Sequence, residues 1–199
     1  MKELALSRWA ELVGIGTTNA MAGLSQMIGQ EIEVDSFGLR KVPVSQISQL
    51  VGGPEAPAVG IYLTVSGAAD GHLMLIYDPR IAYAFVDLLM MQPIGTTTAI
   101  GEMESSALGE MGNVIGAFFL NAIADHTGLS LRPSPPAVMA DMAGALLDVV
   151  SAEILMHGDD TYLAETTFST AEGVISGMFF VMPSDDLLEV LVETVARAA

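Results

Sequence analysis

The stretch SALGEMGNVIGAFFLN, residues 106–121, decides both the fold and the candidate site. Its apolar residues recur at the i, i+3, i+4, i+7 spacing of a helix that buries one side. These expected core positions are Leu108, Met111, Ile115, Phe118, Phe119 and Ala122. On the same helix, Ser106, Glu110 and Asn113 fall within roughly 60° of one another. Ala117 continues their face with almost no side chain.

Two interpretations of this polar face are open. Polar outer faces are normal for surface helices, so Glu110 and Asn113 could be solvated residues without a function. Alternatively, the small neighbours let another surface approach a carboxylate and an amide held one turn apart on a rigid helix. On that interpretation the face serves docking and chemistry.

The composition indicates a folded chain with few basic residues. Of 199 residues, 51% are hydrophobic and 16% are charged, which supplies ample core material. Cysteine is absent, which excludes disulfides, thiolate zinc sites and a cysteine nucleophile. Seven Lys and Arg against 24 Asp and Glu give a formal charge of −17. Because nucleic acids and anionic membranes are bound by clusters of Lys and Arg, we expect neither as a partner.

The N-terminal sequence and the apolar runs predict a soluble protein, and a cytoplasmic location, which the absence of cysteine permits, is expected. The N-terminal sequence MKELALSRWAELVG lacks the apolar run of a signal peptide. The most apolar later run, Val114 to Ala124, is too short to cross a bilayer and contains Asn121.

Periodicity and turn signals predict the order of the elements. In order, they are a helix over 3–28, a strand over 31–44, a short helix over 44–51, a hairpin of 58–66 with 71–77, a helix over 79–91, a linker over 92–98, a helix over 99–126, an extended piece over 129–132, a helix over 138–150, a strand over 152–156, a hairpin of 162–169 with 173–182, and a closing helix capped by Ser184. Gly29 and Gly128 follow the two long helices as C-caps.

This order repeats after roughly 100 residues, which suggests an internal duplication. Across the repeat, Ser7, Glu11, Gly14 and Gly29 match Ser106, Glu110, Asn113 and Gly128. We therefore expect a single α/β domain of the α+β type over 1–199, with half-repeats of about 1–95 and 96–199. Its antiparallel sheet would be joined from the two halves, with long helices packed on it and a pseudo-twofold axis.

The motif Ser-x-x-x-Glu-x-x-Asn resembles the CheC/CheX/FliY phosphatases of bacterial and archaeal chemotaxis. An apolar helix with a later Asn-Ala and the Pro133-Ser-Pro-Pro136 turn follow it, as in that family. The resemblance spans nearly the whole chain, including the duplication, the GTTNAM segment at 16–21 and both hairpins. It implies dephosphorylation of the aspartyl phosphate of the response regulator CheY.

Carried over residue by residue, the resemblance makes Glu110 and Asn113 the catalytic pair. The Glu would pair with the active-site lysine of the regulator, and the Asn amide would orient the attacking water. Ser106 and Ala117 would support docking. The resemblance implies no cofactor and no metal in this chain, with Mg²⁺ on the partner receiver domain. A CheD-type deamidase is a further candidate partner.

The first half departs from the family pattern. Ser7 and Glu11 are present, but Gly14 stands where the amide should be, so this second site is degenerate. We expect one working site. Whether the first helix keeps a binding role through Arg8, Glu11 and Trp9 is open at this stage.

Other interpretations compete with the enzyme. One is a non-catalytic chemotaxis or flagellar-switch module that docks phosphorylated CheY or a CheD-type deamidase. Another is a structural partner whose acidic charge only maintains solubility. His72, His126 and His157 are scattered without metal-ligand spacing, and Asp159-Asp160 is typical of a turn.

Overall fold

The computed structural model describes residues 2–154, 160–170, 173–183 and Val190. The elements are the helices α1 (Lys2–Ile28), η1 (Val44–Gln46), α2 (Ile47–Leu50), α3 (Pro79–Leu89), α4 (Glu102–Thr127) and α5 (Ala143–Ile154), and the strands β1 (Glu33–Pro43), β2 (Pro57–Gly67), β3 (Gly71–Tyr77), β4 (Leu131–Pro133), β5 (Ala137–Met142), β6 (Asp160–Thr170) and β7 (Gly173–Pro183). Helices packed on an antiparallel sheet confirm the predicted fold class.

The strands form one sheet in the order β1-β6-β7-β3-β2-β4, and β5 also pairs with β2. The hairpins β2–β3 and β6–β7 meet through the β3–β7 pair. Each hairpin is then extended by a strand from the other half of the chain, because β1 pairs with β6 and β5 pairs with β2. This order is the one that two related halves would produce. The duplication and the half-repeat bounds themselves stay predictions.

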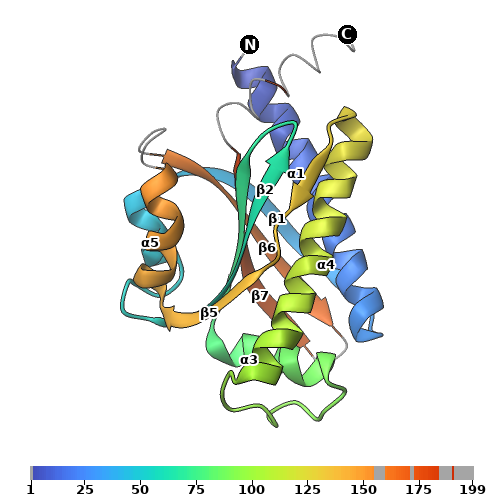
Figure 1. The fold of residues 1–199 in the computed structure, drawn as a ribbon, viewed down its shortest axis with the longest axis vertical. Helices are drawn as coiled ribbons and strands as arrows, with labels where there is room; N and C mark the ends of the chain where they lie inside the picture. The colour runs from blue at the N-terminus through green and yellow to red at the C-terminus, as the bar shows by residue number, and fades with distance from the viewer. Residues whose placement is uncertain (1, 155–159, 171–172, 184–189, 191–199) are drawn as a thin grey trace.

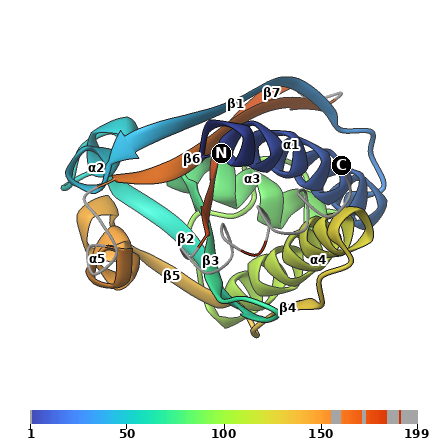
Figure 2. The ribbon, with the colours of Figure 1, turned by 90° about the horizontal axis from the view of Figure 1, so that it is seen from above.

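The sheet carries helices on both faces. Figure 2 shows α1 and α4 side by side on one side of strands β2 and β5, with α5 on the other side. The larger core lies between the sheet and helices α1, α3 and α4, where Trp9, Phe85 and Phe119 are at most 1% exposed. The smaller core lies beneath η1, α2 and α5 and includes Ile47, Met74 and Leu146.

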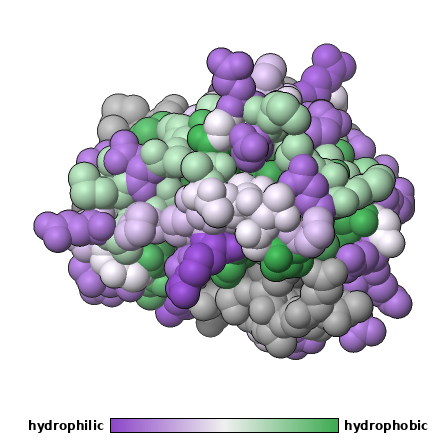
Figure 3. All heavy atoms as spheres, turned by 90° about the horizontal axis from the view of Figure 1, so that it is seen from below, coloured by the Kyte–Doolittle hydropathy of each residue, from purple (hydrophilic) through white to green (hydrophobic). Residues whose placement is uncertain are grey.

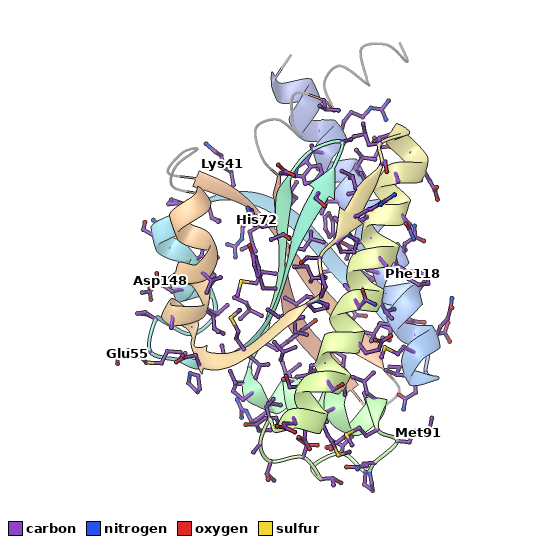
Figure 4. All side chains as sticks on the ribbon, in the orientation of Figure 1. Lys41, Glu55, His72, Met91, Phe118 and Asp148 are labelled. Atoms are coloured by element: carbon purple, nitrogen blue, oxygen red, sulfur yellow. The ribbon has the colours of Figure 1, made fainter. Side chains whose placement is uncertain are left out.

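Helices α1 and α4 pack through glycines that face aromatic rings. A Cβ on Gly16 would come within 2.6 Å of the buried Phe119 ring, and one on Gly23 within 2.8 Å of Phe118. Figure 1 shows the two helices lying side by side along most of their length. The expected core stripe of α4 is correct except at Phe118, which is 36% exposed. Phe118 covers Gly23 at the outer rim of the helix pair (Figure 4), so one side of its ring stays in solvent.

The segment after the proline-rich turn differs from the prediction. Residues 138–142, expected as the start of a helix over 138–150, belong to strand β5 and pair with residues 57–61 of β2. The helix begins at Ala143, whose N–H donates to the carbonyl of Ala56 at 2.8 Å. Because α5 continues to Ile154, the strand predicted over 152–156 is wrong for 152–154, and its remainder lies outside the described residues. Ladder bonds to the edge of β2 outweigh the local helical preference of this segment.

The other predicted elements of the described residues are present, with ends that agree within a few residues. Gly29 and Gly128 have φ values of 68° and 72°, the left-handed conformation of a helix C-cap. Helix α4 begins at Glu102 rather than residue 99, and the N–H of Gly101 donates to Glu104 Oε2 at 2.9 Å. Apart from the helical Val190, the closing helix with its Ser184 cap lies outside the described residues, as do His157 and Asp159 of the expected turn.

The linker before α4 is fixed by one buried carboxylate. Asp87 of α3 is 0% exposed and accepts the N–H groups of Gly95, Thr96 and Thr97 at 2.7, 3.1 and 2.8 Å. Burial raises the pKa of Asp87, but hydrogen bonds from Thr97 and from the backbone of Gly95 and Thr96 outweigh this effect and hold the pKa below its usual value. The segment expected as a linker is thus an ordered loop that determines where α4 begins.

Candidate functional site

The predicted face of α4 lies open to solvent. Ser106, Glu110 and Asn113 are exposed, and Ala117 is half-buried. Among the described residues, neither the Glu110 carboxylate nor the Asn113 amide has a hydrogen bond or an ion pair. Both polar groups are therefore available to a partner, on a helix whose opposite side is fully buried.

A row of glycines seats α4 on the sheet beneath this face. Gly109 and Gly116 pack against Val138 and Leu63, where an added Cβ would lie 3.8 and 3.0 Å away. Gly112, between them, lies still closer to Ile61 of β2. Without side chains at these positions, the helix backbone approaches the strands closely, and the position of Asn113 is set by direct contact.

The proline-rich turn lies directly beside the glycine row. Pro136 and Pro133 are the next neighbours of Gly112 and Gly116, at 3.5 and 3.7 Å from an added Cβ. Ser134 lies between β4 and β5 and continues their hydrogen bonding to β2. Its N–H donates to the carbonyl of Thr64 at 2.8 Å, and its hydroxyl accepts the N–H of Thr64 at 3.0 Å. The turn is thus a rigid wall along one side of the candidate site.

The corresponding face of α1 is closed in two ways. Arg8 Nη1 lies 2.8 Å from Glu11 Oε2, so the carboxylate that matches Glu110 already has an internal partner. Gly14 faces the ring of Phe37 from β1, at 3.6 Å from an added Cβ. Ser7 is exposed as expected. Trp9 is 1% exposed, which assigns it to the core and removes it from any docking surface.

Sequence reasoning missed one residue of the α4 face and one of the α1 face. Met103 lies two helical turns before Glu110 and is 67% exposed. Its signal was the seven-residue spacing to Glu110, which places both residues within roughly 20° on the helix. Phe37 carried no such signal, because its approach to Gly14 depends on the return of β1 along α1.

The remaining candidates are explained by packing. The His72 ring stacks on Tyr62 at 5.9 Å between ring centroids, and the two side chains share a 2.8 Å hydrogen bond. His126 Nδ1 lies 2.8 Å from the carbonyl of Ala122, near the end of α4. No group of three or more His, Cys, Asp or Glu side chains is arranged for a metal ion in the part of the chain that the structure describes.

Helix α4 also qualifies as a membrane span by length and composition alone, among the helices searched in the described residues. The helix extends well beyond the apolar run of 114–124, which is too short by itself to cross a bilayer. Half of its most apolar window is buried inside the protein, where it packs on α1 and the sheet. Core helices of this kind pass the same test.

Comparison with known proteins points to one family. A model described as the CheC-like family matches residues 103–140, which include Glu110, Asn113 and the proline-rich turn. The chain is also similar to the CheY-P phosphatase CheC of Bacillus subtilis (strain 168). The two sequences are 27% identical over 195 residues, which cover 96% of this chain and 93% of the relative.

Solved structures share the fold of this chain. FliY from Thermotoga maritima aligns with a TM-score of 0.74 and 17% identity, covering 97% of this chain and 96% of its own. A CheX-CheY-BeF3-Mg²⁺ complex from Borrelia burgdorferi contains a chain that aligns with a TM-score of 0.56 and 16% identity, covering 85% of this chain and 97% of its own. The resemblance inferred from the sequence motif is confirmed.

Proposed function

We propose that this chain, a member of the CheC-like family, hydrolyses the phosphoaspartate of a CheY-type receiver domain. In this proposal, Asn113 orients the attacking water and Glu110 pairs with the active-site lysine of the receiver. One observation carries it: Glu110 and Asn113 lie exposed and one turn apart, with no partner among the residues that the structure describes, in the segment that matches the family. The similarity to a CheY-P phosphatase over most of the chain supports it.

The chemistry suits an exposed amide. A water oxygen attacks phosphorus in line as the bond between phosphorus and the aspartate oxygen breaks, which yields inorganic phosphate and a free carboxylate. An acyl phosphate is already labile, so positioning and charge stabilisation supply most of the catalysis. The Asn113 carbonyl oxygen can accept a hydrogen bond from the water and fix its direction. This role requires no perturbed pKa in the chain, and the Mg²⁺ would belong to the receiver.

In this proposal, Glu110 aligns the receiver on the face of α4. A carboxylate that meets a lysine ammonium makes a charge-assisted, directed contact. Because Glu110 and Asn113 project from one helix that is seated by glycines on β2, docking at Glu110 also sets the distance from Asn113 to the phosphorus atom. The proline-rich turn next to the glycine row keeps this geometry rigid.

The proposal includes one working site per chain. The Arg8–Glu11 ion pair and the Phe37 ring support inactivity of the first face, which already lacks the amide at Gly14. We also propose that the protein acts in the cytoplasm, where phosphorylated receivers act. A CheD-type deamidase is a candidate second partner.

Phosphate release from a phosphorylated CheY-type receiver with Mg²⁺ tests the proposal. We expect the unmodified chain to accelerate release and Asn113→Ala to lose roughly 100-fold, the scale of a lost positioning contact. Asn19→Ala removes an exposed amide from a different face of α1 and serves as the matched control. Normal turnover by Asn113→Ala would disprove the mechanism.

The same assay separates the phosphatase from a binding module. If the unmodified chain binds the phosphorylated receiver without accelerating release, it acts as a docking component of the chemotaxis or flagellar-switch machinery. If it neither binds nor accelerates release, the receiver is not its partner.

A further inference from the structure

The catalytic face of α4 continues to an exposed methionine. Met103 is 67% exposed in the first turn of the helix, although its side chain is apolar. It lies on the line of Glu110, roughly 10 Å away along the helix axis. Between them, Ser106 adds only a small side chain to the same face. The proposed docking face therefore has an apolar end as well as a polar one.

The charged residues near Met103 limit which partner surfaces can cover it. Helix α4 contains no Lys or Arg, whereas Glu102 and Glu110 are exposed on either side of Met103. A partner that covers this methionine must bring an apolar contact and tolerate or neutralise the two carboxylates. The receiver lysine that is proposed to pair with Glu110 brings one positive charge to this face, whereas an acidic surface would be repelled.

We propose that Met103 is a docking anchor for the phosphorylated receiver, which it contacts two turns away from the reacting phosphate. This inference rests on the proposed function, and it adds a specificity residue that the catalytic pair does not include. Methionine suits such a role because its flexible, polarisable side chain adapts to an irregular apolar surface. Met103 would strengthen binding and leave the chemical step to Asn113.

Other exposed apolar residues do not share this placement. Met91 is 93% exposed, but it follows the end of α3 near the foot of the molecule (Figure 4) and is not part of helix α4. Seen from below, that end of the molecule shows apolar residues interspersed among hydrophilic ones (Figure 3). Met91 is therefore a matched control of the same residue type.

The experiment measures binding and turnover separately. Binding is measured with a CheY-type receiver loaded with beryllofluoride and Mg²⁺, and turnover with the phosphorylated receiver. We expect Met103→Ala to weaken binding roughly five- to tenfold, as for a truncated contact residue. The turnover rate at saturation should stay within about twofold of the unmodified chain. Met103→Leu keeps an apolar side chain and should bind as tightly as the unmodified chain. Met91→Ala should also bind as tightly as the unmodified chain.

The outcomes distinguish this inference from the proposed function. If Met103→Ala binds as tightly as the unmodified chain while Asn113→Ala has lost turnover, the anchor is wrong and the phosphatase stands. If Met103→Leu binds as weakly as Met103→Ala, the anchor is also wrong, because loss of the apolar contact would not be the cause of the weaker binding. If the unmodified chain fails to bind and to accelerate release, both proposals fall.

Discussion

Gly112 of α4 lies so close to Ile61 of β2 that no side chain fits between them. Ile61 is 0% exposed and belongs to a strand paired on both sides, so it has no room to withdraw. This contact fixes the height of α4 above the sheet at the residue before Asn113. The position of the proposed water-orienting amide therefore depends on a missing Cβ.

Gly112→Ala should lower the free energy of unfolding by about 1–3 kcal/mol, because the added methyl group overpacks the core. Gly109→Ala is the control on the same helix face. Its Cβ would meet Val138 at 3.8 Å, an ordinary contact, and alanine favours the helix by up to about 1 kcal/mol. Urea unfolding followed by circular dichroism measures both variants. Equal stabilities would show that α4 can shift freely on β2.

Glu110→Ala and Glu11→Ala should differ in their effect on turnover. Glu110 has no partner among the described residues and is proposed to pair with the receiver lysine, so its loss should weaken receiver binding and turnover together. Glu11 already pairs with Arg8, and both side chains are about half exposed, so its loss should change turnover less than twofold. Steady-state kinetics of phosphate release measures both. Equal losses would mean that the α1 face also engages the receiver.

Gly14→Asn should fold normally but should not restore turnover to an Asn113→Ala chain. The added Cβ would contact Phe37 at an ordinary 3.6 Å, and asparagine is a better helix former than glycine. The Glu11 carboxylate, however, already pairs with Arg8, which competes with the receiver lysine for it. Phosphate release by the double variant, with its thermal unfolding as a folding check, tests this expectation. Restored turnover would show that the first face still docks a receiver.

Asp87→Asn should destabilise the protein by about 1–3 kcal/mol at pH 7, since the amide cannot accept all the N–H groups of residues 95–97. The pKa of Asp87 is lowered in the folded state, so the stability contributed by its ionised form is complete above about pH 4. That stability is lost as the pH falls through the folded pKa. The difference between Asp87→Asn and the unmodified chain should shrink accordingly.

Urea unfolding at a series of pH values measures this difference. Asp148→Asn is the control, since Asp148 is exposed on α5. A gap between Asp87→Asn and the unmodified chain that stays constant from pH 7 to pH 3 would contradict the assignment of the loop to an ionised carboxylate.

The sequence alone determined the features that depend on local spacing. The two long helices, their glycine C-caps and the hairpins followed from periodicity and turn residues, and the structure contains all of them in the described range. The exposure of Ser106, Glu110 and Asn113 also followed, because the side of a helix on which a residue lies depends only on its neighbours three and four positions away.

Only the tertiary structure decided the features that depend on distant partners. The segment 138–142 became a strand because the edge of β2, about 80 residues earlier in the chain, needed ladder partners there. Phe37 came to cover Gly14, and Trp9 to enter the core, through the return of β1 and the sheet along α1. The neighbours of a residue along the chain determine which side of a helix it faces. Strand pairing and burial depend instead on the free energies of contacts between segments that are distant in the sequence.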